Sequence, residues 1–186
     1  MNIYTVGAAT QGLSNYLNKN FKDLDQISVV VGHDCRNNSR LFAEISANIF
    51  SANGIKVYLF EDMRPTPEMS FAIRHLGCQS GIILTASHNP KQWNALKLLN
   101  EHGEFLNAAE GNEVLRIAEA EEFDYADVDH LGSYRKDLTY NQKHIDSVSA
   151  LDLVDVEAIK KANFRVAIDC VNSVGGIILP ELLERL

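Results

Sequence analysis

Hydrophobic residues in this chain follow two alternating patterns, short unbroken runs and helical spacing. Val29-Val30-Val31 is β-branched and has no polar break, which is typical of a strand buried on both faces. Leu41, Phe42, Ile45 and Ile49 instead fall on one face of a helix. Together the two patterns predict helices over residues 3–18, 39–54, 66–77, 108–120, 140–149 and 156–162, and strands over 27–31, 55–60, 81–85 and 96–99.

Capping residues mark the ends of two of these helices. Ser39 is predicted to be the N-cap of the second helix, and Gly54 suits its end. Thr66 followed by Pro67 predicts an N-cap and a proline at the first helical position, with the helix ending at Gly77.

The alternation of strands and helices predicts a three-layer α/β/α domain. The link between strands 81–85 and 96–99 is short, which predicts an antiparallel pair and therefore a mixed sheet. Residues 121–136 are acidic and weakly periodic, so we expect a loop or extended passage there. After Phe164 the pattern restarts as strand, turn and helix. One strand and one helix cannot bury their apolar faces alone, so this part is expected to pack on the first domain, pair with another chain or stay mobile.

Ser87 is the most informative polar residue, because it follows an apolar run that predicts a strand. In open α/β sheets ligands bind beyond such strand ends. A phosphorylated serine carries nearly two negative charges and needs cations, for which His88 and Lys97 are the nearest candidates. The plainer interpretation is that this stretch only connects two strands. A serine hydrolase is a weaker third hypothesis, because the G-x-S-x-G elbow is absent and a triad needs an orienting carboxylate.

A family resemblance strengthens the first interpretation. Thr85-Ala86-Ser87-His88-Asn89-Pro90, then Asn94 and Lys97, resembles the active-site loop of the α-D-phosphohexomutases, which include phosphoglucomutase, phosphomannomutase and phosphoglucosamine mutase. Three further segments resemble the family in the same order, namely residues 29–39 with the pattern G-x-D-x-R-x-x-S, Pro65-Thr66-Pro67, and residues 164–176 with their glycine turn.

The resemblance implies a reversible phosphoryl shift between hexose 1-phosphate and hexose 6-phosphate. Ser87 would carry the phosphoryl group, a bisphosphorylated sugar would be the intermediate, and one phosphate oxygen on Ser87 would ligate Mg²⁺. The resemblance makes His88 and Lys97 catalytic partners of Ser87, and makes Asn89 and Arg36 phosphate-binding residues. Such transfer depends mostly on positioning and electrostatics.

The resemblance also divides the chain. Residues 1–135 would be the family's domain I without its usual first strand, 136–162 an interdomain helical segment, and 163–186 the start of domain II. The family's Asp-Gly-Asp-x-Asp-Arg metal loop, its sugar-recognition loop and its C-terminal phosphate-binding domain are not found in this sequence. We therefore expect an N-terminal fragment that is inactive alone. The alternative is a non-catalytic phosphosugar-binding or interaction module.

The amino-acid composition bears on which molecules the chain could bind. With 17 basic and 25 acidic residues the net charge is −8, which argues against nucleic acid, although local cations could still bind a hexose phosphate. No apolar run approaches the length that spans a bilayer, and no basic region precedes an apolar stretch at the N-terminus, so a cytoplasmic location is expected. Cys35, Cys78 and Cys170 are isolated thiols, which favours a reducing compartment. Cys78 and Cys170 are expected to be buried. Oligomers could form through the C-terminal segment.

Three weaker signals remain. The acidic residues at 124, 127 and 129 with His130 could suggest an oxygen-ligand metal site, but a solvated acidic loop is the preferred interpretation. Asp34 and Arg36 end a strand and could either line a cleft or form a structural ion pair. The turn over residues 169–176 could hold an anion at a helix start, but it lacks the P-loop Gly-Lys-Ser/Thr, so a structural turn is preferred.

Overall fold

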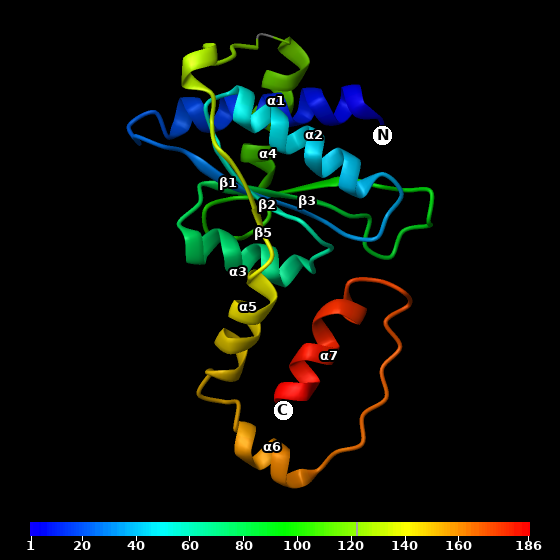
Figure 1. Cartoon of the computed structure of the whole chain (residues 1–186). Helices are drawn as coiled ribbons and strands as arrows, with labels where there is room; N and C mark the ends of the chain where they lie inside the picture. The colour runs from blue at the N-terminus through cyan, green and yellow to red at the C-terminus, as the bar shows by residue number, and fades with distance from the viewer. Residues whose placement is uncertain (122) are drawn as a thin grey trace.

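The chain folds around one mixed sheet whose strand order is β4-β3-β1-β2-β5 (Figure 1). The computed structural model describes residues 1–121 and 123–186. The strands are β1 (Ser28–His33), β2 (Lys56–Phe60), β3 (Ser80–Leu84), β4 (Leu96–Leu99) and β5 (Tyr134–Asp137). β1, β2, β3 and β5 are parallel, whereas β4 is antiparallel to β3, which confirms the mixed sheet.

Helices cover both faces of this sheet, which confirms the three-layer α/β/α prediction (Figure 1). The helices are α1 (Ile3–Asn20), α2 (Ser39–Ala52), α3 (Thr66–Leu76), α4 (Ala108–Ala120), the 3₁₀ helix η1 (Val128–His130), α5 (Tyr140–Ser149), α6 (Val156–Ala162) and α7 (Gly175–Arg185). α1 and α2 lie on one face, with α4 packed against α1, and α3 and α5 lie on the other.

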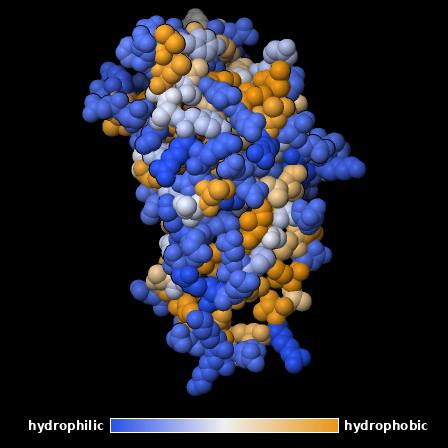
Figure 2. Space-filling model, viewed as in Figure 1, coloured by the Kyte–Doolittle hydropathy of each residue, from blue (hydrophilic) through white to orange (hydrophobic). Residues whose placement is uncertain are grey.

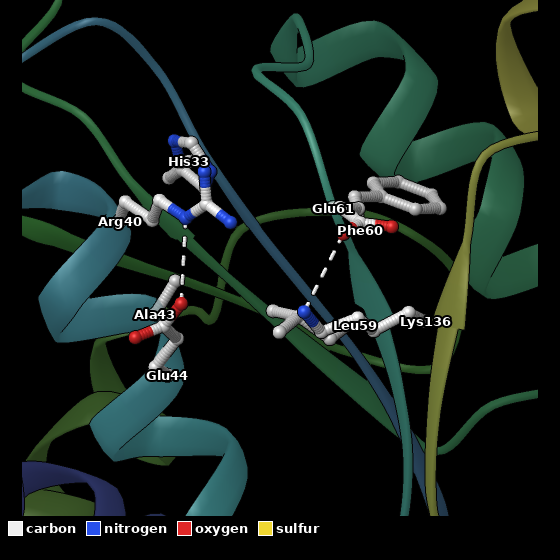
Figure 3. A pocket seen from close by; sticks show the side chains of 8 residues that line it. All are labelled: His33, Arg40, Ala43, Glu44, Leu59, Phe60, Glu61 and Lys136. Atoms are coloured by element: carbon white, nitrogen blue, oxygen red, sulfur yellow. Dashed lines mark hydrogen bonds and ion pairs between the residues drawn. The ribbon is translucent and has the colours of Figure 1, made fainter.

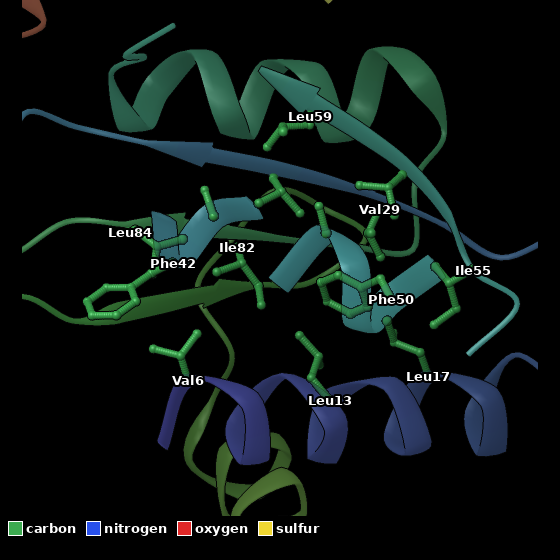
Figure 4. Close-up of a cluster of buried hydrophobic side chains, with 14 of the residues drawn as sticks. Val6, Leu13, Leu17, Val29, Phe42, Phe50, Ile55, Leu59, Ile82 and Leu84 are labelled. Atoms are coloured by element: carbon green, nitrogen blue, oxygen red, sulfur yellow. The ribbon is translucent and has the colours of Figure 1, made fainter. Parts of the chain in front are cut away.

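The central strand supplies both halves of the core. Because side chains alternate along a strand, Val29 and Val31 join the cluster beneath α1 and α2, while Val30 joins the cluster beneath α3. Figure 4 shows the first cluster, where Leu13 of α1 and Phe50 of α2 converge on the sheet. Burial on both faces explains why β1 has an unbroken apolar run instead of an alternating one.

Two predicted helix caps are wrong by one residue. α2 has Asn38 as its N-cap, in the left-handed region with φ 62°, and begins at Ser39. The hydroxyl of Ser39 instead donates to Asp34 Oδ1 at 3.2 Å, so tertiary contacts use the group that was expected to cap. α3 has Pro65 as its N-cap, and the Pro65 carbonyl accepts from the Glu68 N–H at 3.1 Å. Gly77 ends α3 in the left-handed conformation, as predicted.

β5 lies in the stretch that was predicted as loop or extended passage. It adds to the sheet edge beside β2, where the Val57 N–H donates to the Ser133 carbonyl at 2.7 Å. β5 has a polar sequence, because three of its four residues are exposed. The division at residues 1–135, 136–162 and 163–186 stays a prediction, and β5 runs across its first boundary.

Helix α5 is fastened to the sheet at its first residue. Tyr140 is fully buried, and its ring centroid lies 5.3 Å from that of Phe60 and 6.2 Å from that of Phe71. α7 in turn packs against α5, and Arg185 forms an ion pair with Asp146. The C-terminal helix therefore packs on α5, which lies in the segment predicted to connect the two domains.

The strand predicted after Phe164 does not form. Residues 164–170 have no assigned strand, and Phe164 and Val166 remain 70% and 58% exposed. A strand needs a neighbour to receive its backbone hydrogen bonds, and none lies beside this segment within the described residues. For the same reason Cys170 is only half-buried, contrary to its prediction, whereas Cys78 is buried as expected.

Candidate functional site

Ser87 stands in a tight loop just beyond the end of β3. We call residues Thr85–Asn94 the serine loop. Thr85 is buried and Ser87 is exposed, so the chain leaves the core within two residues. The Asn89 N–H donates to the Ala86 carbonyl at 3.0 Å, and Ser87 has φ 51° in the left-handed region. This conformation is uncommon for a residue with a side chain, and such positions concentrate at functional sites.

Asp34 ties the serine loop to the end of β1. Its Oδ2 accepts the Thr85 hydroxyl at 2.5 Å, and its Oδ1 accepts the Ser39 hydroxyl and the Arg36 backbone N–H. The Thr85 hydroxyl oxygen also accepts the Ser87 N–H at 3.2 Å. A carboxylate engaged by several donors fixes its surroundings, so Asp34 sets the position of the turn that carries Ser87.

Arg36 holds the serine loop from outside. Its Nη1 donates to the Pro90 carbonyl at 2.8 Å and its Nη2 donates to the Ser87 carbonyl at 2.5 Å. Of the two interpretations left open by the sequence, the cleft position is the one seen, because Asp34 and Arg36 line one pocket and the guanidinium binds carbonyls. Asn94 completes the enclosure by donating to Ser39 Oγ at 2.9 Å.

The serine loop borders an open pocket of about 360 Å³. Its lining combines the end of β1, the serine loop and the turn before α7. The lining residues are Asp34, Cys35, Arg36, Asn37, Ser87, Asn89, Lys91, Val171 and Ser173. The turn over residues 169–176, interpreted from sequence as structural only, therefore supplies part of the pocket wall. Cys35 Sγ donates to Ser173 Oγ at 3.2 Å and joins the two sides.

The predicted site residues fall into two groups. Ser87, Asn89 and Arg36 line the pocket. His88 lies beside it, with its Nδ1 3.5 Å from Ser87 Oγ, at the outer limit of a hydrogen bond. Lys97 is outside the pocket lining, and its ammonium lies 5.4 Å from the centre of the Phe105 ring.

Lys91 is the lining residue that sequence reasoning missed. It is exposed in the serine loop directly after Pro90. The signal was present, because a lysine that immediately follows an Asn-Pro turn stays close to the turn's other side chains. The ammonium of Lys91 thus adds a positive charge to the pocket wall beside that of Arg36.

A second, much smaller cavity lies at the ends of β1 and β2, where it is bordered by His33, Arg40, Glu44 and Lys136 (Figure 3). The space open to a water-sized sphere is about 10 Å³, which suits one water molecule and not a sugar. Its charged side chains form exposed pairs, Arg40 with Glu44 at 3.4 Å and Lys136 with Glu61 at 3.4 Å. The pocket beside Ser87 is the candidate site because its lining brings Ser87 together with the basic side chains of Arg36 and Lys91.

A buried ion pair between Arg64 and Glu68 lies next to the end of β1. Arg64 and Glu68 are 2% and 0% exposed, and their nearest atoms lie 3.1 Å apart. Burial raises the pKa of Glu68 to about 7, although the charge of Arg64 acts in the opposite direction. The Arg64 N–H donates to the His33 carbonyl at 2.9 Å, so this pair lies directly behind the end of β1.

The described residues contain no group of three His, Cys, Asp or Glu side chains that could hold a metal ion. Around Ser87 the nearby carboxylate is Asp34, whose oxygens already accept hydrogen bonds from Thr85, Ser39 and Arg36. These protein groups alone do not fit a Mg²⁺ site. The acidic stretch at residues 124–130 is exposed at its three aspartates and at His130, in keeping with a solvated loop.

Comparison with known proteins places this chain in a family. The family model described as "Phosphoglucomutase/phosphomannomutase, alpha/beta/alpha domain I" matches residues 1–125. The chain therefore belongs to the phosphoglucomutase/phosphomannomutase family and contains its domain I.

The curated relatives are phosphomutases by name. A human phosphopentomutase is 44% identical over 109 residues, covering 55% of this chain and 18% of that protein. A phosphoglucomutase of Staphylococcus haemolyticus is 30% identical over 201 aligned positions, covering all of this chain and 34% of its own length. The chain thus spans between about a fifth and a third of the length of these relatives.

Solved structures agree. A protein described as a phosphomannomutase from Thermus thermophilus matches the whole chain with a TM-score of 0.84 and 26% identity, covering 40% of that structure. The Paramecium protein pp63/parafusin, a phosphoglucomutase, matches 96% of this chain with a TM-score of 0.75. At 19% identity the second match shows the fold alone. Within residues 1–121 and 123–186, none of the helices has the length and apolar character needed to cross a membrane.

Proposed function

We propose that this chain carries the phosphoryl-transfer serine of a sugar phosphomutase, with Ser87 as the residue that is phosphorylated. One observation carries the proposal. Ser87 is exposed in the left-handed conformation at the end of a buried strand, in a pocket whose wall includes Arg36 and Lys91. A phosphoryl group there would meet the positive charges of Arg36 and Lys91, which favour charge development during transfer.

The transfer can be written with its bonds and protons. A sugar hydroxyl oxygen attacks the phosphorus of phosphorylated Ser87, so a sugar O–P bond forms and the Oγ–P bond breaks. The sugar hydroxyl gives its proton to solvent, and Ser87 Oγ takes up one proton, so the number of protons is conserved. His88 Nδ1, 3.5 Å from Oγ, is the imidazole nitrogen placed to deliver the proton to Oγ. The reverse transfer from the other end of the bisphosphorylated sugar restores phosphorylated Ser87.

The names of the relatives support a sugar phosphate as the substrate class. Both phosphopentomutases and phosphoglucomutases match this chain. We infer a sugar phosphate whose phosphoryl group moves between the anomeric oxygen and the terminal hydroxyl, which includes the predicted hexose 1- and 6-phosphates. Mg²⁺ in the complete enzyme stays part of the proposal, with the phosphate on Ser87 as its contact to this chain.

The chain is proposed to perform the transfer between Ser87 and the sugar but not the full mutase cycle. A cycle must also hold the distal phosphate while the sugar turns over. The matched region covers about a third or less of the relatives' length, and the proposal assigns one phosphate, on Ser87, to the pocket described above.

The test is phosphorylation of Ser87 by a bisphosphorylated sugar. The chain is incubated with glucose 1,6-bisphosphate or ribose 1,5-bisphosphate with Mg²⁺, and the product is mapped by peptide mass spectrometry. We expect one phosphoryl group at Ser87 and none in Ser87→Ala. Ser133→Ala, a matched change at an exposed serine in the β5 region, should label like the wild type.

Two results would contradict the proposal. Labelling that persists in Ser87→Ala would place the acceptor elsewhere. Saturable binding of the sugar phosphate in calorimetry, with no transfer to Ser87, would favour the phosphosugar-binding module instead.

A further inference from the structure

The backbone of Ser87 is hydrogen-bonded on both sides of its Cα atom. Its N–H donates to the Thr85 hydroxyl oxygen at 3.2 Å, and its carbonyl accepts from Arg36 Nη2 at 2.5 Å. A hydrogen bond to the N–H orients the peptide plane before the Cα atom, and one to the carbonyl orients the plane after it. The two bonds together therefore hold the backbone dihedral angles of Ser87, including its φ of 51°.

The direction of the hydrogen bonds at Thr85 follows from its single hydroxyl proton. A hydroxyl group has one proton to donate and two lone pairs that accept. The Ser87 N–H can only donate, so the Thr85 oxygen accepts there. Its own proton then points to Asp34 Oδ2, 2.5 Å away, because a carboxylate only accepts. Asp34 thus orients the Thr85 hydroxyl so that a lone pair faces Ser87.

The last residue of the serine loop is joined to the same carboxylate. Asn94 Oδ1 accepts the Ala95 N–H, which fixes the side-chain amide so that its Nδ2 donates to Ser39 Oγ at 2.9 Å. Ser39 accepts there and keeps its proton for Asp34 Oδ1 at 3.2 Å or the Leu84 carbonyl at 3.3 Å. Hydrogen bonds from the first and last residues of the serine loop therefore both lead to Asp34.

The Thr85 hydroxyl is also shielded from water. Figure 2 shows a largely hydrophilic surface, where a hydroxyl group can exchange its partner for water, but Thr85 is only 6% exposed. Threonine is stiff at χ1 because two heavy atoms are attached to its Cβ atom. The hydroxyl group that reaches Ser87 is therefore fixed in both position and direction.

We propose that Thr85 is a positioning residue for phosphoryl transfer, whose hydroxyl group holds Ser87 in the left-handed conformation that places its side chain in the pocket wall. This inference rests on the proposed function and adds the group that sets the geometry of the phosphoryl donor. Without the hydroxyl group the Ser87 N–H loses its partner, and φ can return to the negative values that residues with a side chain favour. The phosphoryl group would then change its place relative to Lys91, and its transfer depends on positioning.

Two substitutions separate the hydroxyl group of Thr85 from its shape. Thr85→Val keeps the branched shape without the hydroxyl group, whereas Thr85→Ser keeps the hydroxyl group. The measurement is the rate of Ser87 phosphorylation over a range of glucose 1,6-bisphosphate concentrations with Mg²⁺, at a temperature where circular dichroism shows each variant folded. Thr85→Val should lower the maximum rate by roughly 10- to 100-fold with an unchanged half-saturating concentration. Thr85→Ser should stay close to the wild type.

Thr10→Val is the matched control. Thr10 is also fully buried, and its hydroxyl donates to the Val6 carbonyl at 2.8 Å within α1. This variant loses a buried hydroxyl group without changing the serine loop, so the folded protein should be phosphorylated like the wild type. If Thr85 contributed to stability alone, folded Thr85→Val would also reach the wild-type maximum rate.

A second measurement reports the hydrogen bond without any transfer. Amide hydrogen exchange followed by NMR should be at least about tenfold faster at the Ser87 N–H in Thr85→Val than in the wild type or Thr85→Ser. A wild type that takes up no phosphoryl group at Ser87 overturns the proposed function, whereas the exchange rate still decides whether Thr85 holds Ser87. A wild-type maximum rate in Thr85→Val, an equal loss in Thr85→Ser or an unchanged exchange rate at Ser87 overturns the role of Thr85.

Discussion

Two junctions of this chain use the same local device with different results. At the end of β1, Asp34 Oδ1 accepts the Arg36 N–H at 2.9 Å. At the end of residues 164–168, Asp169 Oδ1 accepts the Val171 N–H at 2.9 Å. β1 is buried between β2 and β3, whereas the second run has no neighbouring strand within the described residues. The turn is therefore specified by the local sequence, and the strand is specified by its neighbours.

The neighbouring elements also determine how many hydrogen bonds each aspartate accepts. Asp34 receives further hydrogen bonds from Thr85 and Ser39, which arrive from the end of β3 and the start of α2. The Asp169 carboxylate, which is exposed, accepts its hydrogen bond from two residues further along the same turn. Because neighbouring elements pack around it, Asp34 holds the serine loop in place, whereas Asp169 only closes its own turn.

The largest expected effect on stability comes from the core around β1, where side chains are fully buried. Phe50→Ala should lower the free energy of unfolding by about 3–5 kcal/mol, because the fully buried ring leaves a cavity beneath α2. Urea denaturation followed by circular dichroism measures this change. A loss below about 1 kcal/mol would mean that the cluster in Figure 4 does not dominate stability.

The second largest expected effect is on the pH dependence of stability, through the buried carboxyl group of Glu68. The pKa of Glu68 is raised to about 7 mainly by burial, and Glu181 of α7 adds a smaller increase. A carboxyl group with a raised folded-state pKa stabilises the fold below its unfolded pKa and loses that contribution as the pH rises through about 7. Wild-type stability should therefore fall by up to about 3 kcal/mol between about pH 5 and about pH 8, relative to Glu68→Gln. Parallel urea titrations of both proteins measure it, and equal slopes would contradict the assignment.

The third test compares the two turns directly. Asp34→Ala should destabilise the chain by about 2 kcal/mol, since it leaves the buried Thr85 hydroxyl without its acceptor. Asp169→Ala should stay within about 0.5 kcal/mol, because its surroundings are exposed. Thermal and urea unfolding of the matched pair report the difference. Similar losses in both variants would show that the second junction is packed after all.

The smallest expected effect is that of Phe164→Ala. Although phenylalanine is the same residue type as in the first test, its side chain here is largely exposed, so the change should stay within about 0.5 kcal/mol. Urea denaturation followed by circular dichroism measures the change, as for Phe50→Ala. A loss near that of Phe50→Ala would mean that the side chain of Phe164 is packed against the rest of the chain.

Local patterns predicted most elements because their information lies within each segment. The bounds of β4, α4, α5 and α6 agree with the predictions. β5 was missed because an exposed edge strand has a polar sequence, and the backbone of β2 alone recruits it. The strand predicted after Phe164 was wrong for the opposite reason, because its sequence is apolar but no strand pairs with it within residues 1–121 and 123–186.

Part of the site was predictable because the residues concerned lie close to strand ends in the sequence. Ser87, Asn89 and Arg36 reach the pocket because they directly follow strands whose ends meet at one edge of the sheet. Lys97 does not line it, since its place on β4 opposite Ile83 depends on strand register, which spacing from Ser87 does not reveal. Lys91 lies only four residues after Ser87, so its place in the serine loop was within reach of the sequence.

The buried ring of Tyr140 holds the first turn of α5 against the sheet. A rotation of α6 and α7 relative to the sheet would therefore have to bend the chain in the connection at residues 150–155, beyond the buried ring. The ion pair between Arg185 and Asp146 links α7 to α5 across that connection. Because Ser173 lines the pocket with Ser87, the width of this pocket depends on how α7 is held against α5.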